Sequence, residues 1–229
     1  MTSSNPAKDP KTIREGIHPF NKPVGKTSFS LIRELRKSTG IKKIGHAGTL
    51  DPFASGVMIL LIGREFTRQA DQFITQDKEY RATLHLGVET ATYDPEGAIT
   101  ATSTAVPSLE TIQEALNHFQ GSIMQIPPMY SAKKVKGKKL YELARKGIEI
   151  ERAPCPVHIK TELVSYQYPH LELHITCSKG TYIRSIAHDL GKKLEVGAHL
   201  SALIRTRCGP YQLADCLNIP LFRAATPRG

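Results

Sequence analysis

The sequence has no long hydrophobic run. Its longest uninterrupted apolar stretch is Val57 to Ile62, bounded by Gly56 and Gly63, whereas a membrane-spanning helix needs about 20 apolar residues. The N-terminal residues 1–11 are polar, contain two prolines and lack the apolar stretch of a secretory signal. The sequence therefore predicts no transmembrane span, and residues 1–12 are expected to form a disordered tail.

Cysteine is sparse, and none of it is paired at short spacing. Cys155, Cys177, Cys208 and Cys216 stand singly in the C-terminal half, without the close pairs that chelate zinc. Reduced thiols in or near the core are the simplest interpretation, because the cytosol keeps thiols reduced. We therefore expect a cytoplasmic protein without a structural metal.

Acidic residues are outnumbered. Twenty-one Asp and Glu face 31 Lys and Arg, which gives a net charge of +10 on 229 residues. A soluble chain with this excess is expected to bind a polyanion, although charge alone identifies neither RNA nor DNA. Half of the excess lies in residues 133–152, which hold eight Lys or Arg and three Glu.

Apolar periodicity predicts strands. Apolar and polar residues alternate over 80–86 and 171–177, as in half-buried strands. The apolar run between Gly56 and Gly63 is typical of a strand buried on both faces. A first strand is expected over 13–21 and a last core strand over 198–207.

Three helices are expected between these strands. Thr27 can cap a helix running to about Lys37 with Phe29, Ile32 and Leu35 on its apolar face. Ser108 and Thr181 can cap the other two, and residues 41–52 are expected to form a loop. Because strands and helices intermingle irregularly, the predicted class is α+β, with a mixed, mainly antiparallel central sheet and flanking helices. No internal repeat and no linker marks a second domain.

The loop Gly45–Pro52 is the densest candidate for chemistry. Its two glycines permit close backbone approach, and Pro52 restrains Asp51 to an extended conformation. The strand that follows gives Asp51 a rigid base at which a carboxylate can be held stiffly. The alternative is that Asp51 only caps a turn, as Asp before Pro often does.

A second candidate joins a predicted strand to a helix at residues 178–184. Arg184 falls in the first helical turn, where the helix end is already positive, so a nearby carboxylate or phosphate would explain it. The alternative is a surface arginine in solvent. Tyr80, at the start of a core strand, can equally be a packing residue.

The basic stretch 133–152 also has two interpretations. It can be a solvated loop followed by a short helix, with Leu140, Leu143 and Ala144 inward. It can also be a projecting arm that clamps phosphates, which the central Gly137 and the preceding prolines favour.

Six segments of the chain carry a resemblance. They are FNKPVGKTS (20–28), GHAGTLDPFASGVMIL (45–60), KEYRATLHLG (78–87), PPMYSAKKVKGKKLYELARKG (127–147), SKGTYIRSIAHDLG (178–191) and GAHLSALIRTRCGPY (197–211). Together they resemble the bacterial tRNA pseudouridine-55 synthase family of the TruB type, which modifies the T-loop uridine of most tRNAs. They occur in the family's order and cover nearly all of residues 17–211.

The resemblance implies a pseudouridine-synthase catalytic domain over 13–211 with Asp51 as the catalytic aspartate. It also implies that Tyr80 stacks on the target base and that Arg184 pairs with the aspartate. Tyr182 and Leu203 would line the pocket.

The resemblance assigns further RNA contacts. His46 would fill the gap left by the flipped nucleotides, and Lys22 belongs to a motif that supports the site. Residues 128–152 match a mobile insertion that closes on the RNA stem-loop. The backbone contacts expected from this insertion are Lys133, Lys136, Lys138 and Lys139.

The chain departs from the family in two places. Family members usually carry Thr-Asp-Thr where this chain has Thr90-Ala91-Thr92. Many also append a small C-terminal RNA-binding domain, whereas only 18 residues follow Tyr211. Residues 212–229 are therefore expected to be a tail and not a full second domain.

The expected reaction breaks the bond from N1 to C1′ of a uridine, turns the base over and joins C5 to C1′. The carboxylate can capture C1′ or add to C6, and the sequence leaves both routes open. No metal or organic cofactor is required. The expected partner is the T-arm stem-loop of tRNA, bound by a monomer without an obligatory protein partner or a membrane. The alternatives are a noncatalytic RNA-binding module and a guide-RNA-dependent pseudouridine synthase.

Overall fold

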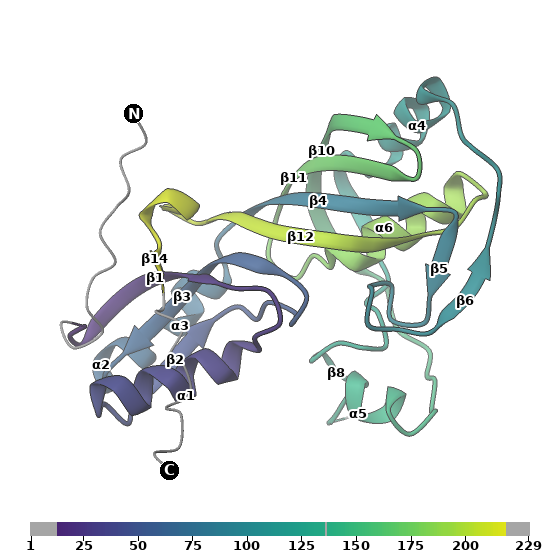
Figure 1. Ribbon diagram of the computed structural model, residues 1–229. Helices are drawn as coiled ribbons and strands as arrows, with labels where there is room; N and C mark the ends of the chain where they lie inside the picture. The colour runs from purple at the N-terminus through teal and green to yellow at the C-terminus, as the bar shows by residue number, and fades with distance from the viewer. Residues whose placement is uncertain (1–12, 136, 219–229) are drawn as a thin grey trace, which may run out of the picture. The chain divides into compact units, whose positions relative to one another are not determined.

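The computed structural model of the protein describes residues 13–135 and 137–218 (Figure 1). The predicted disordered tail 1–12, the predicted RNA contact Lys136 and residues 219–229 lie outside the described residues. The chain divides into two compact units. Of the described residues, 13–76 and 205–218 belong to one unit, and those between Asp77 and Ile204 belong to the other. The single catalytic domain over 13–211 stays a prediction.

The first unit is arranged around strand β3 (Ser55–Ile62). Strands β1 (Gly16–Lys22) and β2 (Ile44–Ala47) both pair with β3 in antiparallel fashion. The short β14 (Leu217–Asn218) pairs in parallel with β1, and β13 (Tyr211–Gln212) pairs with the end of β12 (Ala198–Cys208). The sheet of this unit is therefore mixed.

Helix α1 (Ser28–Thr39) covers one face of this sheet. Its Leu31, Ile32 and Leu35 pack with Met58 and Leu60 of β3 in one apolar cluster. The other face of β3 packs against short helices α2 (Arg64–Thr67) and α3 (Ala70–Ile74) through Phe66 and Phe73. The prediction that this strand is buried on both faces is confirmed.

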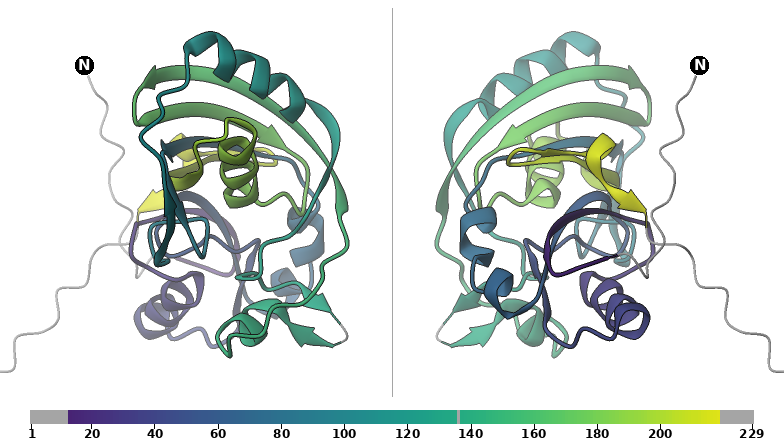
Figure 2. Two further views of the ribbon diagram at one scale, coloured as in Figure 1. Left: turned by 90° about the vertical axis from the view of Figure 1, so that its right-hand side faces the viewer. Right: turned by 90° about the vertical axis from the view of Figure 1, so that its left-hand side faces the viewer.

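The second unit contains a sheet in the order β12-β4-β11-β10-β7. Four of its strands pair antiparallel with one another in this order: β4 (Lys78–Leu86), β11 (His170–Cys177), β10 (Cys155–Gln167) and β7 (Gly121–Gln125). Figure 2 shows the long, curved course of β10 and β11 in green. Buried and partly exposed residues alternate along β4 and β11, as the sequence predicted.

Helices and hairpins flank this second sheet. Helix α4 (Leu109–Leu116), followed by the 3-10 turn η2 (Asn117–Phe119), contacts β10, and α6 (Ile183–Lys193) contacts β4. Strands β5 (Val88–Thr90) and β6 (Ile99–Thr102) form one hairpin. A second hairpin, β8 (Lys134–Val135) and β9 (Lys138–Lys139), leads into α5 (Leu140–Ala144). The predicted α+β class is confirmed.

Several local predictions need correction. Thr27 caps α1 as predicted, accepting a hydrogen bond from the Ser30 N–H at 3.0 Å. Phe29, however, is 60% exposed, because it lies about 200° around the helix from the buried Leu31. The expected loop 41–52 contains strand β2. Helix α6 begins one residue later than predicted, with Tyr182 as N-cap, since the Thr181 hydroxyl donates to the Ser178 carbonyl instead.

Candidate active site

The backbone on both sides of Asp51 is held by α1 and by the turn that precedes it. The Ser28 hydroxyl donates to the Leu50 carbonyl at 3.3 Å and accepts the Leu50 N–H at 3.2 Å. The Pro52 carbonyl accepts the Gly25 N–H at 2.8 Å. These contacts join the segments 20–28 and 45–60. The backbone is therefore held by hydrogen bonds at both residues next to Asp51, Leu50 and Pro52.

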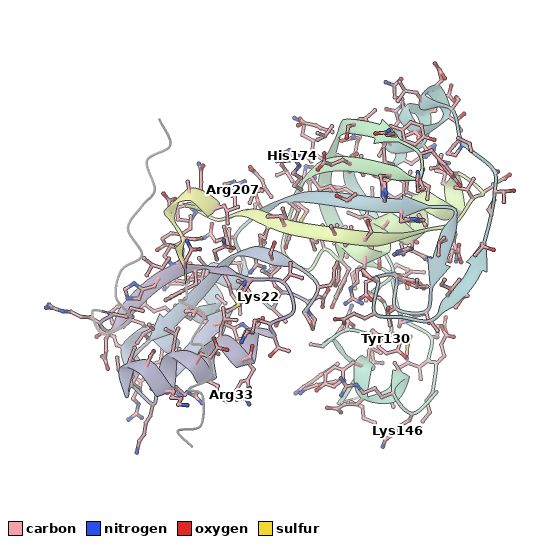
Figure 3. All side chains as sticks on the ribbon, in the orientation of Figure 1. Lys22, Arg33, Tyr130, Lys146, His174 and Arg207 are labelled. Atoms are coloured by element: carbon pink, nitrogen blue, oxygen red, sulfur yellow. The ribbon has the colours of Figure 1, made fainter. Side chains whose placement is uncertain are left out.

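Lys22 is a buried cation that serves this same loop (Figure 3). Its side chain is 0% exposed, and Nζ donates to the carbonyls of Pro23, Lys26 and Pro52 at 3.0, 2.6 and 3.2 Å. A buried ammonium is costly unless such oxygens surround it. This position agrees with the expected support of the site by Lys22. A role of Lys22 in RNA binding stays a prediction.

Arg205 is a second buried support, which the sequence analysis missed. It is 1% exposed; its Nε donates to the Val57 carbonyl at 2.6 Å and Nη2 to the Gly48 carbonyl at 3.3 Å. Gly56 permits this packing, because a Cβ there would lie 2.2 Å from the Arg205 carbonyl oxygen. Local sequence gives no signal for it, because β12 ends with two arginines, Arg205 and Arg207, on either side of Thr206.

His46 lies on β2 in the same unit. Burial lowers the pKa of its imidazole below the usual value, and the neighbouring Arg205 guanidinium lowers it further, while a hydrogen bond with the Gly48 backbone acts in the opposite direction. The ring is therefore neutral near pH 7. A neutral imidazole can stack or insert among bases without a net charge.

In the second unit, Arg184 is buried at the start of α6. It is 6% exposed, so the alternative of a surface arginine in solvent is wrong. Its Nη1 lies 3.4 Å from Oδ2 of Asp94 and donates to the Thr92 carbonyl at 3.0 Å, and Nη2 donates to the Tyr130 carbonyl at 2.8 Å. Asp94 therefore supplies a nearby carboxylate of the kind expected for Arg184, although the sequence analysis did not select this residue.

Asp94 is itself held in place. It is 4% exposed, and its Oδ1 accepts the Glu96 N–H at 3.0 Å. Its carbonyl accepts the Thr90 hydroxyl at 2.7 Å. The turn after β5 therefore holds the Asp94 carboxylate in a fixed position, and the carboxylate orients the Arg184 guanidinium.

The other predicted pocket residues lie on neighbouring elements of this unit. Tyr80 is 8% exposed on β4 and lies opposite Ile175 of β11, and Leu203 is buried on β12. Tyr182 is clamped by one side chain, because Gln125 accepts its N–H at 2.8 Å and donates to its carbonyl at 3.0 Å. Their contacts with a base stay predictions.

The basic insertion 128–152 forms a hairpin and a helical turn. Lys134 pairs with Lys139 and Val135 with Lys138, and Leu140 of α5 is fully buried. Lys133 contacts Sγ of Cys155 on β10 at 2.5 Å. Figure 3 marks Tyr130 and Lys146, which lie before and after this hairpin. The contacts of Lys133, Lys138 and Lys139 with RNA stay predictions.

Two family descriptions match the chain. Residues 36–183 match the model described as TruB family pseudouridylate synthase (N terminal domain). Residues 184–226 match that of the tRNA pseudouridylate synthase B C-terminal domain. The first match assigns the chain to the pseudouridylate synthases. Within that class, the chain belongs to the TruB family.

Individual relatives agree with this assignment. The chain is 62% identical over 209 residues to tRNA pseudouridine synthase B of Protochlamydia amoebophila (strain UWE25), covering 91% of this chain and 80% of that protein. It is 56% identical over 206 residues to the protein of the same name from Chlamydia abortus (strain DSM 27085 / S26/3), covering 90% and 88%.

A solved structure supports the fold. A chain in the crystal structure of a Cbf5–Nop10–Gar1 complex is similar with a TM-score of 0.68 and 27% identity. The similar region covers 92% of this chain and 56% of that one, so this chain spans about half the length of that protein. Within the described part of the chain, no helix is both long and apolar enough to cross a membrane.

Proposed function

We propose that this chain isomerises the T-loop uridine at position 55 of tRNA to pseudouridine, with Asp51 as the catalytic carboxylate. The observation that carries the proposal is an aspartate on a backbone held by Ser28, Lys22 and Gly25, in a chain that belongs to the TruB family. A catalytic group needs this kind of rigid support.

The reaction requires an ionised Asp51. The carboxylate either captures C1′ as N1 departs or adds to C6 of the uracil, and both routes remain open. In either route C5 of the turned uracil then bonds to C1′ and the bond to the carboxylate breaks. C5 loses its proton and N1 gains one, so the product has the same atoms as the uridine. We propose that Arg184 pairs with Asp51 during this sequence, because a guanidinium stabilises the anion and orients it.

The fixed surroundings of Arg184 fit such a role. Its contacts with Asp94, Thr92 and Tyr130 define one position for the guanidinium plane before RNA binds. A preorganised cation stabilises charge without reorganising during the reaction. Arg184→Lys should therefore be severely impaired, since an ammonium cannot reproduce the planar arrangement of donors.

The uridine must leave its stack before it reacts. Extruding a base costs a few kcal/mol, and stacking on an aromatic ring at about 1–3 kcal/mol offsets part of that cost. We propose Tyr80 for this stack, with Tyr182 and Leu203 as the pocket wall. Water would hydrolyse the intermediate, so an apolar wall favours isomerisation.

The two alternatives make different predictions about partners. A noncatalytic RNA-binding module would bind tRNA without changing it. A guide-dependent synthase would need an added RNA, and one structural relative is a chain of a Cbf5–Nop10–Gar1 complex. The relatives named tRNA pseudouridine synthase B favour an enzyme that acts on tRNA itself. We propose a cytoplasmic monomer without an obligatory protein partner.

One experiment separates these three functions. The purified chain is incubated with an unmodified T-arm stem-loop, and pseudouridine is mapped at each position. The proposed function predicts conversion of one loop uridine without any addition, because the enzyme reads the shape of the loop. Binding without conversion, or conversion only with a guide RNA, would contradict it.

A further inference from the structure

A second concentration of positive charge lies in the first unit, in α1 and its connection to β2. Residues 33–43 hold five Lys or Arg and one Glu. This segment contributes +4 and residues 133–152 contribute +5 to the net charge of +10, so the rest of the chain is nearly neutral. The RNA backbone contacts proposed above use only the insertion. The charge of residues 33–43 therefore needs its own explanation.

The cations of this segment all have exposed side chains. They are Arg33, Arg36, Lys37, Lys42 and Lys43. Among the described residues none of the five forms an ion pair. The single carboxylate of the segment, on Glu34, is already paired with Lys26, whose Nζ lies 2.5 Å from Oε1. The segment therefore presents a positive surface that no acidic side chain neutralises.

Helix stability explains only part of this surface. Arg36 and Lys37 lie in the last turn of α1, where positive charge stabilises a helix end, and Arg36 also donates to the Ile44 carbonyl at 3.2 Å. Arg33 lies before that turn and Lys42 lies beyond the helix, so this effect accounts for neither. Because like charges repel one another, a polyanionic ligand would relieve an unfavourable arrangement.

An exposed aromatic ring lies on the same face of α1. In a helix of 3.6 residues per turn, Phe29, Arg33 and Arg36 fall within about 60° of one another. The Phe29 ring is 60% exposed, whereas Leu31 and Leu35 on the opposite side are buried; Arg33 is labelled in Figure 3. Proteins that bind single-stranded nucleic acid combine aromatic rings, which stack on bases, with cations that follow the backbone. The face carries both parts of such a surface.

We propose that the solvent face of α1 and the connection to β2 form a second RNA-binding surface, whose ligand is a part of the tRNA outside the T-arm stem-loop. Ser28, at the start of α1, holds Leu50 next to Asp51. Lys37 follows nine residues later, about 14 Å farther along the helix axis. Cations at that distance and beyond contact RNA remote from the target uridine, whereas the insertion is the proposed clamp for the stem-loop. The proposal rests on the proposed function only in taking tRNA as the ligand.

The test compares two RNAs and two double variants. Full-length unmodified tRNA and its isolated T-arm stem-loop, each fluorescein-labelled, are titrated at several salt concentrations with the wild-type chain and with Arg33→Gln/Lys42→Gln. Both side chains are exposed and without an ion pair among the described residues, so the variant should fold normally. The matched control is Arg64→Gln/Arg68→Gln, which removes the same charge at α2, on the other face of β3.

For full-length tRNA, we expect Arg33→Gln/Lys42→Gln to flatten the dependence of log affinity on log salt by roughly 1.5 units, because each lost phosphate contact releases about 0.7–0.9 fewer counterion. Affinity at about 0.1 M salt should fall at least tenfold. Stem-loop binding should stay unchanged, and the control variant should bind both RNAs nearly as the wild type does. Equal losses for the two RNAs, equal losses for the two variants, or no loss at all would each overturn the proposal.

The ring is tested separately with Phe29→Leu, which keeps an apolar side chain, and with Phe29→Tyr as the control that keeps the ring. Phe29→Leu should weaken binding of full-length tRNA at least about fivefold, the lower end of the range for one base stack, without changing the salt slope. Full-length binding that is unaffected by Phe29→Leu would contradict the proposed surface. Pseudouridine formation by the wild-type chain in the isolated stem-loop tests the proposed function independently, because that reaction does not need this surface.

Discussion

Three basic side chains of the candidate site are almost fully buried, and each of them holds nearby backbone in place. Lys22, Arg184 and Arg205 each donate to backbone carbonyls from segments distant in sequence. Lys and Arg are rarely buried without such partners. Their burial therefore points to the backbone segments that these side chains hold together. Sequence reasoning selected Arg184 from its place in the first turn of a helix and Lys22 through the resemblance. It passed over Arg205, because nothing local distinguishes it from Arg207 on the same strand.

At Gly56 the packing against Arg205 leaves no room for a side chain. We expect Gly56→Ala to lower the free energy of unfolding by at least about 3 kcal/mol, because its Cβ would overlap the Arg205 backbone and φ is +106°. Gly40→Ala is the control: φ is +75° there, but no atom lies within 4 Å of the added Cβ, so about 1–2 kcal/mol is expected. Urea denaturation measures both, and equal losses would contradict the account.

His188 gives the protein a defined pH dependence. Burial lowers its folded pKa to about 4, below the ordinary 6.5, so between these values the unfolded state binds more protons and stability falls as pH falls. We expect the stability difference between wild type and His188→Gln to be flat above pH 7. Between pH 6.5 and pH 4, the wild type should lose about 2 kcal/mol more of its free energy of unfolding than His188→Gln does.

The comparison with His188→Gln is needed because Asp189 acts in the opposite direction. Burial raises the pKa of Asp189 to about 6, so this carboxyl favours the folded state as pH falls. Asp189 is present in both chains and largely cancels in their difference. A difference curve independent of pH from 4 to 8, measured by chemical denaturation, would show that His188 is not buried as described.

At the scale of elements, local patterns predicted the strands and helices whose own residues carry the signal. The period-two alternation of β4 and β11 and the apolar run of β3 were sufficient. The start of α6 was misplaced by one residue because Thr181 bonds backward to Ser178, and local sequence does not distinguish the two turns. The pairing of Arg184 with Asp94 joins residues 90 positions apart, so only the fold reveals it.

The hairpin of the insertion can be tested as a phosphate clamp. We expect replacement of Lys136, Lys138 and Lys139 by Gln to flatten the dependence of log affinity on log salt by roughly two units, because each phosphate contact releases about 0.7–0.9 counterion. Selection of the target uridine should survive, since backbone contacts carry no sequence information.

The matched control for this test is Lys160, Lys192 and Lys193 replaced by Gln, which removes the same charge from β10 and the last turn of α6. It should change the slope much less. Equal slopes for the two triple variants, measured by titrating the stem-loop at several salt concentrations, would remove the clamping role from residues 133–152.

For the whole molecule, sequence alone was enough to predict the α+β class, and family membership confirmed the resemblance. The elements that support Asp51 belong to one compact unit, and those that carry Tyr80 and Arg184 to the other. The proposed chemistry assigns Asp51 the covalent step and gives the second unit the base and the counter-cation. Binding and catalysis should then be separable by mutation.

The most direct test of this account is Asp51→Asn. The amide is isosteric but cannot act as the nucleophile, while the phosphate contacts remain. Pseudouridine formation and affinity are measured with the same T-arm stem-loop under single-turnover conditions. We expect isomerisation to be abolished and affinity to change by less than about tenfold. Appreciable turnover by correctly folded Asp51→Asn would contradict the assignment of Asp51 as the catalytic carboxylate.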